Sequence, residues 1–183
     1  MKRLVLLALI GVTIISCNKE KPVKDYLILS GKIDNFKKRD VTLNGFRFNK
    51  KIKFDKKTGS FSDTLRINRD GYYTLIVNKR PINLYLNDTV NTGIVFDYKN
   101  PDVINFEGTN ANINNYFVQK RKKFAEILVN ANQLFSLEEQ DFLDKMDEYK
   151  EALTELSISN NLSPDFLKHE VKNIDYEYLR NLS

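Results

Sequence analysis

The sequence predicts an α+β fold, an antiparallel β-sandwich or open barrel of about eight strands followed by three amphipathic helices. Two observations support this prediction. Up to Phe106, short stretches of alternating apolar and polar residues are separated by Gly, Asn and Asp every eight to twelve positions. After Gly108, apolar residues recur at intervals of three and four, the helical period. The chain therefore divides into a β-domain, 26–107, and a helical region, 108–183.

The predicted strands each have one buried face. Ile82, Leu84 and Leu86, for example, point to the same side of an extended chain. Asn44-Gly45 and Asp70-Gly71 interrupt the pattern with residues that accept positive φ, so tight hairpins are expected there. The expected strands span residues 27–33, 40–43, 46–54, 61–67, 72–77, 82–86, 94–98 and 103–106.

Three helices are expected after the β-domain, and the first spans residues 111–132. A capping box formed by Ser136 and Glu139 predicts the start of the second helix. Pro164 directly after Ser163 predicts the start of the third, because proline is tolerated at the first helical position. The expected apolar stripe of the third helix consists of Leu167, Val171, Ile174 and Tyr178.

Residues 1–16 are predicted to be a lipoprotein signal peptide. Lys2 and Arg3 precede twelve uncharged residues, and the small residue Ser16 marks the expected cleavage site. The apolar run is shorter than the roughly 20 residues that span a bilayer, so a transmembrane anchor is the weaker interpretation. Residues 17–25 are expected to be a lipidated tether.

The segment Ile14-Ile15-Ser16-Cys17 resembles the lipobox of bacterial lipoproteins. The resemblance implies that the Cys17 thiol receives a diacylglyceryl group, that the chain is cut after Ser16, and that the new amino end is acylated. Two or more acyl chains anchor a protein stably. The alternative is a cysteine that happens to follow an ordinary signal peptide. Asn18 is not the Asp that retains some such proteins at the inner membrane, so the expected location is the cell envelope, at the outer membrane facing the periplasm.

Composition limits the chemistry that the chain can perform. Cys17 is the only cysteine, so once it is lipidated no disulfide, CxxC motif or cysteine nucleophile remains. No cofactor is expected beyond the covalent lipid. Residues 18–107 carry 18 Lys and Arg against 11 Asp and Glu, whereas residues 108–183 carry 9 against 13. A basic half followed by an acidic half indicates two differently built parts that could attract one another.

For each candidate catalytic or metal-binding residue, the favoured interpretation is an ordinary solvated or turn position. His169 would need a positioned partner to act as a general base, and the sequence shows none. Asn87-Asp88-Thr89 lacks the spacing of an EF-hand and is interpreted as a turn. Carboxylates of the second helix could bind a metal or hydrolyse a glycoside, but they fit a wet helix face better. These are Asp141, Asp144, Asp147, Glu148, Glu151 and Glu155.

Basic residues interleaved with aromatic ones surround one predicted hairpin. The pattern can bind nucleic acid, but an exported protein rarely meets any, so no nucleic-acid partner is predicted. Anionic lipid headgroups or lipopolysaccharide are better partners, and a solvated face that discourages edge pairing is the favoured interpretation. The same argument applies to residues 120–123, Lys-Arg-Lys-Lys. The hairpin residues are Arg47, Lys50, Lys51, Lys53, Lys56 and Lys57.

Several turn and strand motifs point to a known family. They are Lys57-Thr58-Gly59-Ser60-Phe61, Asp70-Gly71-Tyr72-Tyr73, Phe106-Glu107-Gly108 and Asn114-Asn115-Tyr116. With the lipobox, they resemble the amino-terminal region of thiol–disulfide interchange lipoproteins of the thioredoxin/AhpC-TSA type. In that family a β-domain of unknown function and helices precede a thioredoxin domain with a WCxxC motif. No residue here matches the catalytic cysteines, and the sequence stops where that domain would begin.

Two main hypotheses follow. The favoured one is a membrane-anchored lipoprotein that is not an enzyme and serves as a binding or scaffolding module, with an envelope protein or an anionic lipid or glycan as partner. The alternative is the front of a thioredoxin-like oxidoreductase whose CxxC domain lies beyond residue 183. A third, weaker hypothesis is a glycan-binding sandwich in which Tyr72 or Tyr85 stacks on sugars. The sequence leaves the oligomeric state open.

Overall fold

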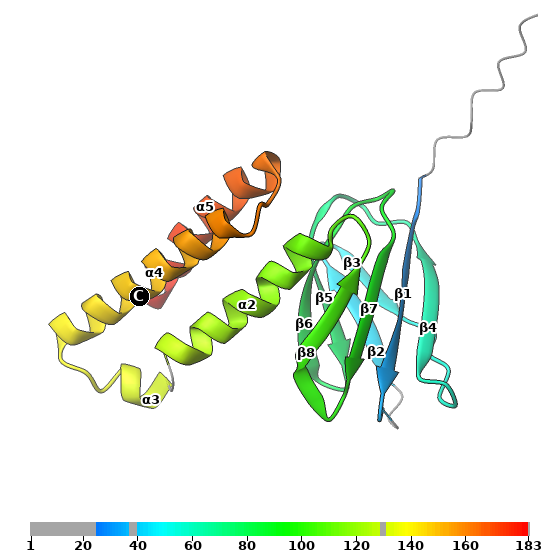
Figure 1. Ribbon diagram of the computed structural model, residues 1–183, viewed down its shortest axis with the longest axis horizontal. Helices are drawn as coiled ribbons and strands as arrows, with labels where there is room; N and C mark the ends of the chain where they lie inside the picture. Colours follow the sequence, from blue (N-terminus) through cyan, green and yellow to red (C-terminus); the bar gives the residue numbers. More distant parts are fainter. Residues whose placement is uncertain (1–24, 37–39, 129–130, 183) are drawn as a thin grey trace, which may run out of the picture.

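The computed structural model describes residues 25–36, 40–128 and 131–182, and it shows a β-sandwich with helices packed on one side (Figure 1). The predicted signal peptide, including Ser16, and the predicted lipidation site Cys17 lie outside the described residues. The strands are β1 (Leu27–Asp34), β2 (Val41–Gly45), β3 (Phe48–Lys51), β4 (Ser60–Leu65), β5 (Gly71–Val77), β6 (Arg80–Leu86), β7 (Thr92–Asp97) and β8 (Asn100–Glu107).

The eight strands form two four-stranded sheets, in the orders β4-β1-β7-β8 and β3-β2-β5-β6. The described strand pairs are antiparallel except β1 and β7, which run parallel with Leu29 opposite Thr92. The sheets stack and do not close into a barrel. The predicted α+β class and the sandwich are therefore confirmed, and the open barrel is not the form adopted.

The interior of the sandwich is one continuous apolar cluster. Alternate residues of each strand point inward, as Leu27 and Leu29 do from β1, and Leu75 and Val77 do from β5. Burial of a side chain such as leucine stabilises the fold by about 1.5–3 kcal/mol. The outward-facing residues of the same strands are free to serve another purpose, and on β5 and β6 they face the helices.

The hairpin between β2 and β3 differs from its prediction. Asn44 pairs with Asn49 and Gly45 with Phe48, so the chain turns at Phe46 and Arg47 instead of at Asn44-Gly45. Arg47 adopts the positive φ, 50°, and its guanidinium lies over the Phe46 ring. The predicted strand 46–54 is correspondingly reduced to β3, and beyond it Phe54 makes only an isolated bridge to Phe61.

The helical region contains three long helices and one short one. They are α2 (Ala111–Ile127), α3 (Ala131–Leu134), α4 (Glu139–Ser159) and α5 (Pro164–Asn181). The prediction of a single helix over 111–132 is wrong beyond residue 127, because Leu128 caps α2 and a separate turn follows. None of these described helices combines the length and apolar character that crossing a bilayer requires.

One of the two predicted helix starts is correct. The Ser163 hydroxyl accepts a hydrogen bond from the Phe166 amide at 3.3 Å, and Pro164 opens α5. The predicted capping box is wrong. The Ser136 hydroxyl donates to the Gln133 carbonyl at 2.8 Å, on the α3 side, and α4 begins after Glu138 without a side-chain cap.

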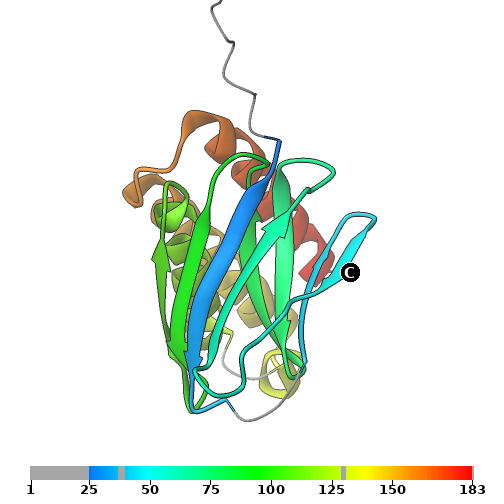
Figure 2. The same cartoon turned by 90° about the vertical axis from the view of Figure 1, so that its right-hand side faces the viewer.

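The predicted apolar stripe of α5 is correct for Ile174, which is buried, and for Leu167 and Tyr178, which pack partly buried against apolar clusters, but it is wrong for Val171. Phe166, Glu170 and Ile174 form its buried side, whereas Val171 is 47% exposed. The reason is its place in the assembly, since α2 runs from the end of β8 along β6 and carries α4, and α5 packs on α4. The helices lie behind the sandwich when the sheet that contains β1 faces the viewer (Figure 2).

Candidate functional site

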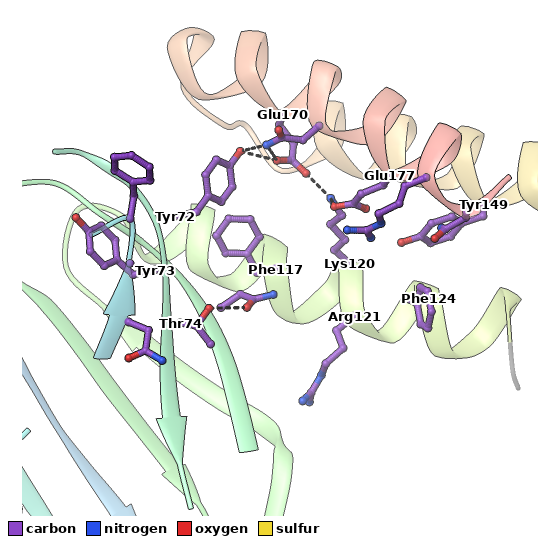
Figure 3. Close-up of a pocket in the computed structure, with 17 residues that line it drawn as sticks. Tyr72, Tyr73, Thr74, Phe117, Lys120, Arg121, Phe124, Tyr149, Glu170 and Glu177 are labelled. Atoms are coloured by element: carbon purple, nitrogen blue, oxygen red, sulfur yellow. Dashed lines mark hydrogen bonds and ion pairs between the residues drawn. The ribbon is translucent and has the colours of Figure 1, made fainter. Parts of the chain in front are cut away.

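A cleft of about 680 Å³ lies between the outer face of the β3-β2-β5-β6 sheet and helices α2 and α5. Figure 3 shows side chains from the strands and from both helices converging on it. Aromatic, amide and charged groups share the lining. Its residues are Asn44, Gly45, Phe46, Tyr72, Tyr73, Thr74, Asn83, Phe117, Lys120, Arg121, Phe124, Tyr149, Glu170, Asn173, Glu177, Arg180 and Asn181.

The floor of the cleft is a row of polar side chains that crosses three strands. Asn44 on β2 lies opposite Thr74 on β5, and Thr74 lies opposite Asn83 on β6. These residues point outward because their strand neighbours, such as Leu75, point into the sandwich core. The Thr74 hydroxyl donates only a long hydrogen bond, 3.5 Å, to the Asn83 Oδ1 atom. The row therefore keeps hydrogen-bonding capacity directed at the cleft.

Aromatic rings join the sheet to the helices beside this row, two residues along β5 and β6. Tyr72 packs edge-on against Tyr85, its cross-strand neighbour, with ring centroids 5.8 Å apart. Both rings contact Phe166 of α5, and Tyr72 also contacts Phe117 of α2. Tyr85 is covered by this packing, but Tyr72 stays 44% exposed and forms a wall of the cleft.

Behind Tyr72 lies Glu170, a carboxylate that is completely buried. Its Oε2 atom accepts a hydrogen bond from the Tyr72 hydroxyl at 2.8 Å. Its Oε1 atom accepts one from the Tyr116 hydroxyl at 2.9 Å and one from the Lys120 ammonium at 2.6 Å. A buried carboxylate is tolerated only with such partners, and these come from β5 and α2. Glu170 therefore links α5 to both β5 and α2.

Glu177 and Asn173 complete the Glu170 network. Lys120, only 13% exposed, also forms an ion pair with Glu177 at 2.9 Å. Asn173 donates to the Tyr72 hydroxyl and, at 3.3 Å, to the Oε2 atom of Glu170. Lys120 therefore bridges two carboxylates of α5, and the Tyr72 hydroxyl both donates and accepts.

The tyrosines around the cleft are held in their neutral form. Burial, and after it the nearby Glu170 carboxylate, raise the pKa values of Tyr72 and Tyr116 well above the usual range. Burial followed by Glu177 does the same for the pKa of Tyr149. At neutral pH all three stay protonated, and the Tyr72 and Tyr116 hydroxyls donate hydrogen bonds to Glu170, so these side chains are poorly matched to proton transfer.

Another part of the cleft lining carries two arginines and an exposed ring. Arg121 of α2 forms an ion pair with Asp102 at 2.9 Å and contacts the Pro101 carbonyl at 3.3 Å. Arg180 lies in the last turn of α5. Phe124, 49% exposed, stands edge-on to Tyr149 with ring centroids 5.7 Å apart. This part of the lining presents positive charge beside an accessible ring.

The basic hairpin does not contribute charge to this cleft. Lys50 pairs with Asp63 at 2.8 Å and Lys51 pairs with Asp40 at 3.2 Å. Lys53, Lys56 and Lys57 are exposed and line no part of the cleft, and Arg47 turns to Phe46 beside it. The hairpin therefore has the solvated face favoured from the sequence.

The second basic segment is different, and here the predicted wet face is wrong for its first residue. Lys120 is buried at the cleft, whereas Lys122 is exposed. Consecutive residues of a helix point in different directions, so Lys120 can face α5 while Lys122 faces solvent. The sequence alone does not show which of these four basic residues is directed toward the cleft.

The remaining candidate residues of the sequence lie on exposed helix faces or in a turn. His169 is exposed, as are the six carboxylates predicted for the wet face of α4. The backbone amide of Asp88 donates to Asp70 at 2.8 Å, as expected of a turn. Within the described ranges, no three His, Cys, Asp or Glu side chains gather closely enough to hold a metal ion.

Sequence reasoning missed the two most informative parts of the site. Glu170, which follows His169, was not among the predicted site residues. It lies four residues after Phe166 and four before Ile174. A carboxylate in the middle of an apolar helical stripe is a usable signal of a buried charge. The row of Asn44, Thr74 and Asn83 depends on strand register, which the sequence did not provide.

Comparison with known proteins adds no assignment. No protein-family model matches the chain, and neither a curated protein nor a solved structure matches it significantly.

Proposed function

We propose that this protein is a non-catalytic binding module, tethered to the cell envelope through lipid on Cys17, and that its ligand occupies the cleft beside the β3-β2-β5-β6 sheet. The observation that carries the proposal is the cleft itself, about 680 Å³ and bounded by two regions of the chain. Binding sites commonly lie at such junctions and combine apolar surface with a few fixed polar groups.

The state of the polar groups supports binding without catalysis. A catalytic acid or base needs a pKa near the working pH and access to the reacting proton. The Glu170 carboxylate is instead fully buried and accepts hydrogen bonds from Tyr72, Tyr116 and Lys120. These groups hold the wall of the cleft in place.

A pre-formed cleft also favours binding. Helix α5 is fixed to the sheet by the Tyr72–Glu170 hydrogen bond and by the ring contacts of Phe166. Because the walls are already ordered, a ligand does not have to supply the free energy of ordering them. The site is thus suited to small ligands with modest interaction energy.

The anchoring part of the proposal is tested by metabolic labelling with a radioactive fatty acid. The wild-type protein should incorporate the label and sediment with membranes, and Cys17→Ser should lose both properties. Wild-type protein that sediments without label would contradict the lipid anchor. The intact mass of the membrane-extracted protein should match residues 17–183 plus lipid. A mass larger by about 100–150 residues would favour the alternative in which a redox domain follows.

The binding part is tested by blocking the cleft. Asn83→Trp places a large ring over the polar row, while Asn105→Trp places the same ring on the exposed face of β8 as a matched control. Peptides, glycans and lipid headgroups from the envelope are screened for thermal stabilisation of the unlipidated Cys17→Ser protein. We expect at least one class to stabilise the control and not the blocked variant. If every ligand class gives the two variants the same thermal stabilisation, the cleft is not the binding site.

A further inference from the structure

We infer that the ligand of the cleft is a short acidic oligosaccharide. This inference rests on the proposed binding function and names the ligand class for the same site. Three features of the cleft carry it: the polar row on the sheet face, the accessible aromatic rings beside it, and the sign of the exposed charge.

The polar row matches a chain of hydroxyl groups. Side chains on neighbouring strands are about 4.8 Å apart, so Asn44, Thr74 and Asn83 present amides and a hydroxyl at regular intervals. An asparagine amide both donates and accepts hydrogen bonds, as does each sugar hydroxyl. A saccharide lying across the strands can therefore satisfy the row.

The same geometry disfavours other ligand classes. An extended peptide binds a sheet by pairing with its edge, whereas this cleft lies over the face of β2, β5 and β6. The Asn44 and Asn83 amide oxygens accept from Asn49 and Thr74, but an acyl chain would place hydrocarbon against their amide nitrogens and offer them no acceptor, which is costly. The floor of the cleft is thus suited to a hydroxyl-rich ligand.

Exposed rings supply the apolar contacts that a sugar needs. Tyr72 is 44% exposed and Phe124 is 49% exposed, and both line the cleft. Each ring is fixed by an aromatic neighbour, Tyr72 by Tyr85 and Phe124 by Tyr149. Rigid rings of this kind offer flat apolar surface at little cost in side-chain entropy.

Charge selects an acidic saccharide over a neutral one. Glu170 and Glu177 are both engaged by Lys120, so the acids of the cleft are partly neutralised from within. Arg121 pairs with Asp102, but both side chains are well exposed and such pairs are weak, about 0–1 kcal/mol. A ligand carboxylate can compete for that guanidinium, which lines the cleft.

The test titrates the Cys17→Ser protein with a panel of uronic-acid trisaccharides of different linkages, each paired with its neutral methyl ester, by calorimetry. We expect at least one acid form to bind at least tenfold more tightly than its ester, because charge-assisted hydrogen bonds are lost in the ester. Arg121→Gln should remove most of that difference. Lys172→Gln, the same change of charge at an exposed site on α5, should keep it.

The polar row is tested with the same ligands. Asn83→Ala should weaken the acid and the ester alike by roughly fivefold, and Asn105→Ala should change neither. Equal binding of acid and ester would overturn the role of charge, and absence of binding across the panel would overturn the saccharide. If another ligand class still binds in a way that Asn83→Trp blocks, the proposed binding function survives. If nothing binds the cleft, both proposals fail.

Discussion

The β-domain and the helical region are held together in different ways. The sandwich interior is one continuous apolar cluster, whereas the buried apolar residues of the helices fall into two smaller clusters. One of these, with Phe166 at its centre, also needs Tyr85 from the sheet. The attachment of α5 further depends on a single buried carboxylate, Glu170. We therefore expect the helices to depend on the sandwich more than the sandwich depends on them.

The largest effect is expected from a cavity in the shared support. Leu75 is fully buried on β5, the strand that carries Tyr72 on its other face. Leu75→Ala should lower the free energy of unfolding by about 4 kcal/mol, from lost burial and the cavity left behind. In urea denaturation, strand and helix signals should be lost together at a lower midpoint.

The matched control for this change is Leu179→Ala, because Leu179 is largely exposed on α5. It should change the stability by no more than about 0.5 kcal/mol. If the helical signal of Leu75→Ala survives after the sheet signal is lost, the helices are independent and the comparison is wrong.

A smaller and more local effect is expected at Glu170. Glu170→Ala removes the acceptor of the Tyr116 hydroxyl and one of the two carboxylates held by Lys120, so about 3 kcal/mol should be lost. Hydrogen exchange should accelerate in α5 and stay slow in β1. Glu151→Ala, which alters an exposed carboxylate of α4, is the control and should leave both rates unchanged. Faster exchange in β1 would show that the sandwich depends on the attachment of α5, contrary to the comparison above.

The tyrosine hydroxyls predict how alkaline pH acts on the same junction. The unfolded chain releases tyrosine protons near pH 10, whereas the raised pKa values of Tyr72 and Tyr116 keep those protons in the folded protein. The folded state then binds more protons, so stability falls as pH rises above about 10. Fully buried Tyr116 contributes a slope of up to about 1.4 kcal/mol per pH unit.

Denaturation midpoints measured from pH 9 to 11.5 check this slope. Tyr116→Phe should make it shallower, because the ring stays while the ionisable group is removed. Tyr176→Phe is the control, since Tyr176 is exposed on α5. A slope that Tyr116→Phe leaves unaltered would mean that another group controls the alkaline transition.

The same comparison explains how much of the structure could be predicted. Period-two alternation located the strands, because one face of each strand is buried whatever its neighbours are. The parallel pairing of β1 with β7 could not be predicted, since pairing is set by contacts between residues far apart in the chain. Within the α5 stripe, Val171 was wrong for the same reason. Val171 fits a helical period, but the helix turns Phe166 and Glu170 toward its partners.

The candidate site was less predictable than the fold. The side chains that form it come from β2, β5, β6, α2, α4 and α5, which meet only in the folded chain. Tyr72 was singled out as a candidate sugar contact and does line the cleft, but Tyr85, singled out with it, is packed under Phe166. Both residues are tyrosines in predicted strands. Only their positions relative to the helices in the folded chain distinguish them.

The smallest expected effect separates two serines that the sequence treats alike. Ser163 caps α5 by accepting from the Phe166 amide, whereas Ser136 donates to the Gln133 carbonyl and caps no part of α4. Ser163→Ala should lower the free energy of unfolding by about 1 kcal/mol, because the amide loses its acceptor. Ser136→Ala should cost less than half as much, since the exposed Gln133 carbonyl can turn to water. Urea midpoints of the two variants measure the difference. Equal losses would mean that Ser136 does serve the start of α4, and that the helical region gains more stability from its own ends than from its attachment to the sheet.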